Sequence, residues 1–168
     1  MGKIIIIALV LLSVSANAQV LWQGATVGMS VQEVLTVVPH AIKVDKGGTL
    51  YGGARELVRV PRIEVSSNQF RAEFFFVDGK LTQVTLKLDE QLNYIAAHII
   101  FEELVDLLRA KYGKELSLRE QNGPMSESGA EWISGKTNIS LTMVLIANMP
   151  AILNVNYQVR VSGETDKL

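Results

Sequence analysis

The sequence predicts an α+β domain in which an antiparallel sheet of about six strands carries two helices on one face. Two segments have the three- and four-residue apolar spacing of amphipathic helices, and several others alternate apolar and polar residues as strands do. The strand–helix–strand crossovers of a parallel sheet cannot be recognised between these segments. The alternating strands and the amphipathic helices therefore need a shared core.

The first helix is predicted to begin at Val31 and to end near Val38. Ser30 and Glu33 have the spacing of a capping box, in which each side chain pairs with an otherwise unpaired amide of the first turn. Pro39 disfavours helical backbone at the residue before it. The helix should therefore be only two to three turns long.

Several glycines and a proline lie between this helix and the next strongly predicted strand. Residues 41–53 contain two glycine pairs and are expected to form loop or edge structure. Residues 57–65 look extended, but Pro61 cannot donate to a strand ladder, which indicates an edge strand or a bend. Residues 66–68 form a turn cluster.

The strongest strand signal lies in residues 70–88, around a central Asp-Gly pair. A two-residue turn would place Val77 opposite Lys80, whereas a three-residue loop would place Phe76 opposite Lys80. The second register is preferred because it gathers the alternating apolar residues on one face. These residues are Phe70, Ala72, Phe74, Phe76, Val84, Leu86 and Leu88.

The second half of the chain repeats this order of elements. The longest helix is predicted over 94–112, followed by an exposed polar loop over 117–129. Alternating strands over 139–145 and 153–161 then form a hairpin, and 162–168 form a disordered tail.

The two halves, residues 24–88 and 94–161, resemble one another, since each reads as a helix followed by about three strands. A tandem αβββ repeat would explain the likeness, and so would chance similarity between any two helix-then-hairpin segments. Both halves belong to a single domain predicted over 19–161.

Residues 1–18 read as a secretory signal peptide that is cleaved after Ala18. Lys3 precedes an apolar run that is too short to span a bilayer, and Ala16-Asn17-Ala18 supplies the cleavage pattern. No cysteine follows this position, so a lipid anchor there is excluded. The mature protein is expected to be soluble, and either periplasmic or secreted.

Composition excludes several classes of function. The mature chain has a net charge of −2 without any basic stripe, which argues against nucleic acid and anionic membranes as partners. The absence of cysteine excludes thiol catalysis, disulfide exchange and cysteine-bound metal. No cofactor or metal motif is recognised, so none is predicted.

A helix opening on Gly28-Met29-Ser30, with a glutamate one turn on, precedes an F-x-F-x-D-G-K-L hairpin at 74–81. This pattern resembles the small lipoproteins of the outer-membrane β-barrel assembly machinery and the tandem-repeat β-lactamase inhibitor proteins. The resemblance implies an exported protein that works by binding another protein, which is most simply another envelope protein. The chain differs from the lipoproteins and the inhibitors in lacking their anchoring or disulfide cysteines.

The ionisable residues offer little catalytic chemistry, and the protein is predicted not to be an enzyme. His98 lies on or beside the apolar stripe of the second helix, where a hydrogen-bonded residue at the core margin is the simplest interpretation. Glu102 and Asp106 fit an ordinary solvated helix face. The alternative function is a small periplasmic hydrolase that uses His98 with a nearby carboxylate.

The predicted partner-binding residues are Phe75, Leu81 and Ile133. Phe75 lies between two core phenylalanines and must point to the opposite face of the sheet, where Leu81 and Ile133 would join it in an open apolar patch. The alternative is that the segment 41–60, or residues 20–22, folds over this patch.

Overall fold

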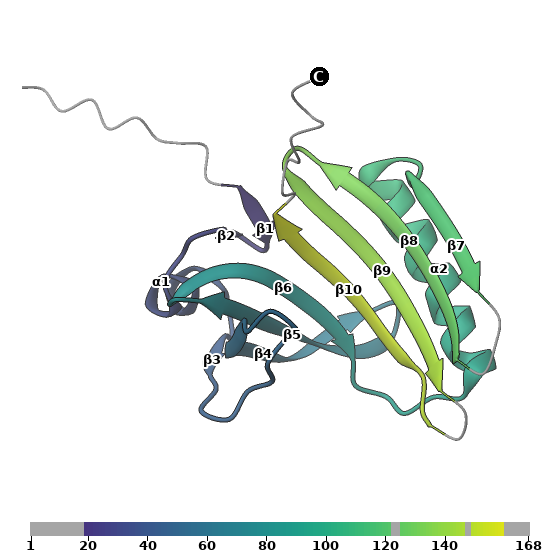
Figure 1. Ribbon diagram of the computed structural model, residues 1–168, viewed down its shortest axis with the longest axis horizontal. Coiled ribbons are helices and arrows are strands. Elements are labelled where there is room, and N and C mark those ends of the chain that lie inside the picture. Colours follow the sequence, from purple (N-terminus) through teal and green to yellow (C-terminus); the bar gives the residue numbers. More distant parts are fainter. Residues whose placement is uncertain (1–18, 122–124, 147–148, 160–168) are drawn as a thin grey trace, which may run out of the picture.

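The computed structural model describes residues 19–121, 125–146 and 149–159, and is an α+β fold built on one eight-stranded antiparallel sheet (Figure 1). The strand order is β3-β4-β5-β6-β10-β9-β8-β7, and a separate two-stranded hairpin is formed by β1 and β2. The predicted signal peptide and the predicted tail at 162–168 lie outside the described residues. The elements are β1 (Val20–Trp22), β2 (Ala25–Thr26), α1 (Val31–Val37), β3 (Ile42–Lys43), β4 (Arg55–Val65), β5 (Asn68–Val77), β6 (Lys80–Leu88), α2 (Tyr94–Tyr112), β7 (Ser117–Gln121), β8 (Met125–Ser134), β9 (Thr137–Ile146) and β10 (Ile152–Val159).

The predicted fold class is confirmed, but the sheet has more strands than the six expected. The additional strands are β3 and β7, which form its two ends. Both are short, and β7 is polar, so neither has the long apolar alternation of a central strand. The prediction of a loop over 117–129 is therefore wrong, because β7 and the start of β8 lie within it.

Helix α1 follows the predicted boundaries closely. The amide of Ser30 donates to the Glu33 carboxylate at 2.7 Å, and the amide of Glu33 donates to the Ser30 hydroxyl at 3.3 Å, which completes the capping box. The backbone becomes extended at Val38, before Pro39. Val34 and Val38 are buried in the core.

The turn of the β5–β6 hairpin differs from the preferred prediction. Val77 pairs with Lys80 across a two-residue turn, because Asp78 and Gly79 both adopt positive φ, at 48° and 73°. A bulge then shifts the register between Phe75 and Phe76. This bulge restores the predicted apolar face, since the Phe70, Ala72 and Phe74 positions pair with Leu88, Leu86 and Val84.

Strand β4 is irregular where Pro61 lies. Its register with β5 shifts between Val60 and Ile63, so the proline stands at an exposed interruption of the ladder. The expectation was an edge strand or a bend, and the structure shows a register shift in a strand next to the end of the sheet. Strand β4 is the last long strand at this end of the sheet, next to the two-residue β3.

One hydrophobic core joins both helices to one face of the sheet. Asn93 caps α2 by accepting from the Ala96 amide at 3.0 Å, and Gly113 ends the helix at φ 85°. Helix α2 packs chiefly on β9 and β8, as Figure 1 shows. Neither described helix is both long and apolar enough to cross a membrane. The core side chains from the helices are Val34, Val38, Ala97, Ile100, Phe101, Leu104, Val105 and Leu108.

Candidate functional site

The predicted apolar patch on the second face of the sheet does not exist as an exposed surface. Phe75 is only 3% exposed and Leu81 is completely buried, so the expectation of an open patch is wrong. The hairpin bulge turns Leu81 to the main core beside Phe76. Ile133 is partly exposed, but three strands separate β8 from β5, so it cannot extend a patch around Phe75.

The end of the sheet near Phe75 is closed by the chain itself. Glu56 lies opposite Phe75 on β4, and its amide donates to the Gly48 carbonyl at 2.9 Å. The amide of Val44 donates to the Leu57 carbonyl, so the segment 44–54 runs along the outer edge of β4. The segment 41–60 of the alternative is therefore found along the edge of β4, next to the strand that pairs with Phe75.

An ion pair between a buried carboxylate and a partly exposed arginine lies at this closed end. The Glu56 carboxylate is buried, accepts from the Gly48 amide at 3.0 Å, and receives two hydrogen bonds from Arg59 at 2.6 and 2.8 Å. Burial alone would raise the pKa of Glu56, but the hydrogen bonds from Arg59 and Gly48 outweigh it and hold that pKa below its ordinary value. Glu56 therefore remains charged and anchors the loop to the strand.

A row of polar side chains crosses the second face next to Phe75. In one cross-strand row, Glu73, Thr85, Asn156 and Ser140 follow one another over four neighbouring strands. The Thr85 hydroxyl donates to the Asn156 side-chain carbonyl at 2.9 Å, and the Asn156 amide donates to the Ser140 hydroxyl at 3.3 Å. These hydrogen bonds link the polar side chains of the row to one another, and the row presents no apolar side chain.

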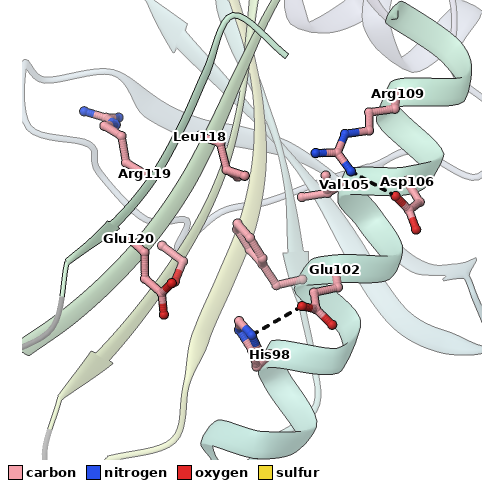
Figure 2. A pocket seen from close by; sticks show the side chains of 10 residues that line it. His98, Glu102, Val105, Asp106, Arg109, Leu118, Arg119 and Glu120 are labelled. Carbon is pink, nitrogen blue, oxygen red and sulfur yellow. Dashed lines mark hydrogen bonds and ion pairs between the residues drawn. The ribbon is translucent and has the colours of Figure 1, made fainter. Parts of the chain in front are cut away.

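The opposite end of the sheet is open. Strand β7 is the last strand in the order, and no described segment pairs with its outer edge. A groove of about 420 Å³ lies between β7 and α2 (Figure 2). Helix α2 lines it with His98, Phe101, Glu102, Val105, Asp106 and Arg109. The strands line it with Leu118, Arg119, Glu120 and Ser128.

The side chains of β7 alternate across this groove. Figure 2 shows Leu118 directed towards α2, whereas Arg119 points away from the helix. Leu118 is 56% exposed, although it lies on the core side of the strand, because the sheet ends there. Arg119 donates to the Glu131 carboxylate of β8 at 2.7 Å. The groove therefore offers an exposed apolar side chain next to a free strand edge.

The arginine of the α2 wall is neutralised by its neighbours. Arg109 donates to both carboxylate oxygens of Glu115, at 2.7 and 2.8 Å, and to Asp106 at 3.2 Å. The hydrogen bonds from Arg109 lower the pKa of Glu115 to about 2, so this pair is ionised across the neutral pH range. Arg109 contributes little free positive charge to the groove.

His98 is held in the wall by stacking. Its ring lies 5.5 Å from that of Tyr94 and 6.3 Å from that of Phe101, close to parallel with both. Nε2 lies 3.5 Å from the Glu102 carboxylate, and Nδ1 is buried without a hydrogen-bond partner among the described residues. A histidine base in a triad needs both a carboxylate and a hydroxyl, and only the carboxylate is in contact here.

The other ionisable candidates are not brought to this groove. His40 is exposed and lies beside Val37 and Pro39, in a second depression near Val60. Within the described ranges, no three histidine or acidic side chains are grouped as metal ligands would be. The groove at β7 is therefore the candidate site.

The sequence was also compared with known proteins. The model of a protein family, the TP0088 domain, matches residues 20–158. The chain belongs to the TP0088 domain family. No match to it was found among the curated proteins or among the solved structures. The resemblance to assembly lipoproteins and inhibitor proteins, with the protein-binding role that it implied, stays a prediction.

Sequence reasoning missed the groove of this TP0088 domain because it interpreted 117–129 as a loop. One signal was present, since Leu116 and Leu118 alternate with polar residues in a stretch that is otherwise charged. Both leucines are exposed. Exposed leucines at alternating positions next to charged residues are typical of an edge strand with one face towards a helix.

Proposed function

We propose that this TP0088 domain is an exported protein-binding domain that acts through the outer edge of β7 and the adjacent groove. The observation that carries the proposal is the difference between the two sheet ends. The β4 end is covered by the chain's own segment 44–54, whereas the β7 edge has no strand partner among the described residues. An uncovered edge offers backbone donors and acceptors to a strand from another protein.

The side chains around the edge support a protein partner. Leu116 and Leu118 are large, exposed and apolar, and they stand beside charged residues, as in the mixed surfaces of transient interfaces. On the other side of the groove, α2 contributes the apolar side chains of Phe101 and Val105. A partner strand would gain main-chain hydrogen bonds from the edge and side-chain contacts from the groove.

Export to the periplasm or the cell exterior is part of this proposal. It rests on the signal-peptide pattern of residues 1–18. The mass of the protein recovered from the envelope or the medium tests it, since cleavage after Ala18 leaves Gln19 as the first residue. A chain recovered there that still begins at Met1 would contradict it.

Site-specific crosslinking tests the binding function. A photo-crosslinking amino acid replaces Leu118 in one variant and Ile42 in a second, and both are exposed on end strands of the sheet. We expect a discrete crosslinked envelope protein with the probe at Leu118 and none at Ile42. Equal crosslinking at both positions, or none at Leu118, would contradict a binding role for the β7 edge.

The hydrolase remains the second candidate, because His98 and Glu102 line the same groove as the hydroxyl of Ser128. It predicts that the purified protein cleaves simple ester or amide substrates and that His98→Gln abolishes this cleavage. Absence of turnover in the wild-type protein would remove this candidate. The binding function does not depend on the outcome, because it uses the strand edge.

A tandem duplication would fit both halves of the fold. Each helix is followed by four strands, and the sheet order is symmetric about the contact between β6 and β10. We infer two αββββ halves, one more strand in each than the αβββ unit expected from the sequence. In this interpretation β3 and β7 are equivalent end strands, of two and five residues, so β7 offers the longer edge.

A further inference from the structure

The groove beside β7 has an excess of negative charge once its internal ion pairs are taken into account. Arg109 is engaged by Glu115 and Asp106, and Arg119 is engaged by Glu131. Glu120 has no ion-pair partner in the described part of the chain, and the only one of Glu102 is His98, at 3.5 Å. Figure 2 shows Glu102 and Glu120 on opposite walls of the groove.

We propose that this groove binds an extended peptide segment of a partner protein in which a lysine or arginine side chain lies between Glu102 and Glu120. This inference rests on the proposed protein-binding function and names the chemistry of the partner. A cation of this kind complements the two carboxylates, and its aliphatic stem can lie along the apolar wall.

The register of β7 predicts the sequence pattern of the bound segment. Leu118 and Glu120 are two residues apart, so both project to the groove side of the strand. A strand added at the outer edge places its own groove-side residues opposite them. The segment should therefore carry an apolar residue two positions from its basic residue, with the apolar side chain against Leu118 and Phe101.

The wall near Glu102 also has an unsatisfied polar atom. In the part of the chain that the structure describes, Nδ1 of His98 is buried without a hydrogen-bond partner, although the ring stacks between Tyr94 and Phe101. Buried polar atoms are rarely left unpaired in folded proteins.

Two synthetic peptides test the inference. The first has the sequence Thr-Val-Thr-Lys-Thr-Val-Thr with blocked ends, which places a valine two positions from the lysine in either strand direction. The second carries glutamate in place of the lysine. We expect the lysine peptide to bind the mature protein about tenfold more tightly at low salt, and this preference to shrink as salt screens the carboxylates.

Matched variants locate the effect. Glu120→Gln should reduce the preference for the lysine peptide about fivefold, whereas Glu103→Gln, on α2 next to Glu102 but outside the groove, should leave it unchanged. Both residues are exposed, so both variants should keep the melting temperature of the wild-type protein. Amides of β7 should gain protection from hydrogen exchange when the lysine peptide is bound.

Equal binding of the two peptides, no binding of either, or a preference that survives Glu120→Gln would overturn the inference. So would concentration-dependent dimerisation that the lysine peptide cannot compete with, because the edge would then be occupied by a second copy. If Leu118 still crosslinks to an envelope protein in these cases, the binding function stands and only the basic segment is refuted. If the crosslink is absent as well, both fail.

Discussion

The two ends of the sheet occupy equivalent places in the chain but are finished differently. Strands β3 and β7 are each the first strand after a helix, and each ends the sheet. Strand β3 has only two residues, and the chain after it turns back along β4. Strand β7 has five residues and leaves its edge uncovered by any described segment.

This difference indicates which end of the sheet contributes to stability and which end is open to a partner protein. Exposed strand edges invite pairing with other chains, and proteins usually cover or shorten them. Here one end strand is short and the chain after it runs along β4, where the buried Glu56 carboxylate pairs with Arg59 and accepts from the Gly48 amide. Changes at the closed end should therefore affect stability, whereas changes at the open end should affect binding.

The largest expected effect at the closed end is that of Phe75→Ser. Phe75 is buried between β4 and β6 on the second face, so the change removes a large apolar side chain and leaves a cavity. We expect a loss of about 3 kcal/mol in the free energy of unfolding, measured with urea. The control Val77→Ser, at the exposed end of the same strand, should cost less than about 0.5 kcal/mol. A Phe75→Ser protein as stable as this control would show that the second face is not closed.

Loss of the Glu56 charge should have the next largest effect. Glu56→Gln leaves Arg59 without its charged partner and should cost about 2 kcal/mol. Since the pKa of Glu56 is lowered in the folded state, its contribution is present above the ordinary value of 4.5 and is lost as the pH falls through the lower, folded-state pKa. Unfolding experiments at pH 7 and pH 3 should therefore show a smaller difference between wild type and variant at the acidic pH. A constant difference would contradict the ion pair.

The contact between the loop and β4 can be tested with two neighbouring glycines. A Cβ at Gly47 would lie 2.2 Å from the Glu56 carbonyl oxygen, whereas at Gly48 the nearest atom would be a carboxylate oxygen of Glu56 at 4.0 Å. Gly47→Ala should cost about 1.5 kcal/mol, because backbone must move, and Gly48→Ala should be close to neutral. Equal melting temperatures for the two variants would mean that the loop does not pack as described.

The smallest effect on stability is expected at the open end. Leu118→Ser removes a side chain that is already more than half exposed, so unfolding should change by less than about 0.5 kcal/mol. The same change should weaken binding of the lysine peptide at least fivefold, because the apolar contact beside the edge is lost. Ile42→Ser serves as the control and should alter neither quantity. Unfolding of the Leu118→Ser protein would place this residue in the core instead.

The sequence predicts elements well where the signal is local. Ser30 and Glu33 mark the start of α1 because a capping box uses only residues within one turn. The apolar face of β5 and β6 follows from alternation, but the turn does not, because the bulge next to Phe75 corrects the register after a tight two-residue turn. Local chemistry thus predicts faces better than it predicts register.

The candidate site could not be predicted from local sequence patterns, because it depends on how distant segments pack together. Alternation places Phe75 on the second face, but its burial there is a result of tertiary packing, which a local pattern does not encode. The groove depends on the distance between β7 and α2, which is set by the packing of α2 on β8 and β9. His98 and Glu102 could be placed on one side of the helix from their spacing, whereas Glu120 across from them could not.

Amide hydrogen exchange at the two ends of the sheet tests the central claim most directly. The amides of Gly48 and Glu56, which are hydrogen-bonded within the closed end, should be protected with or without the lysine peptide. The amides of β7 that face its outer edge should exchange quickly in the free protein and become protected when the peptide is added. Outer-edge β7 amides that are already protected in the free protein, or that stay unprotected with the peptide bound, would contradict the account.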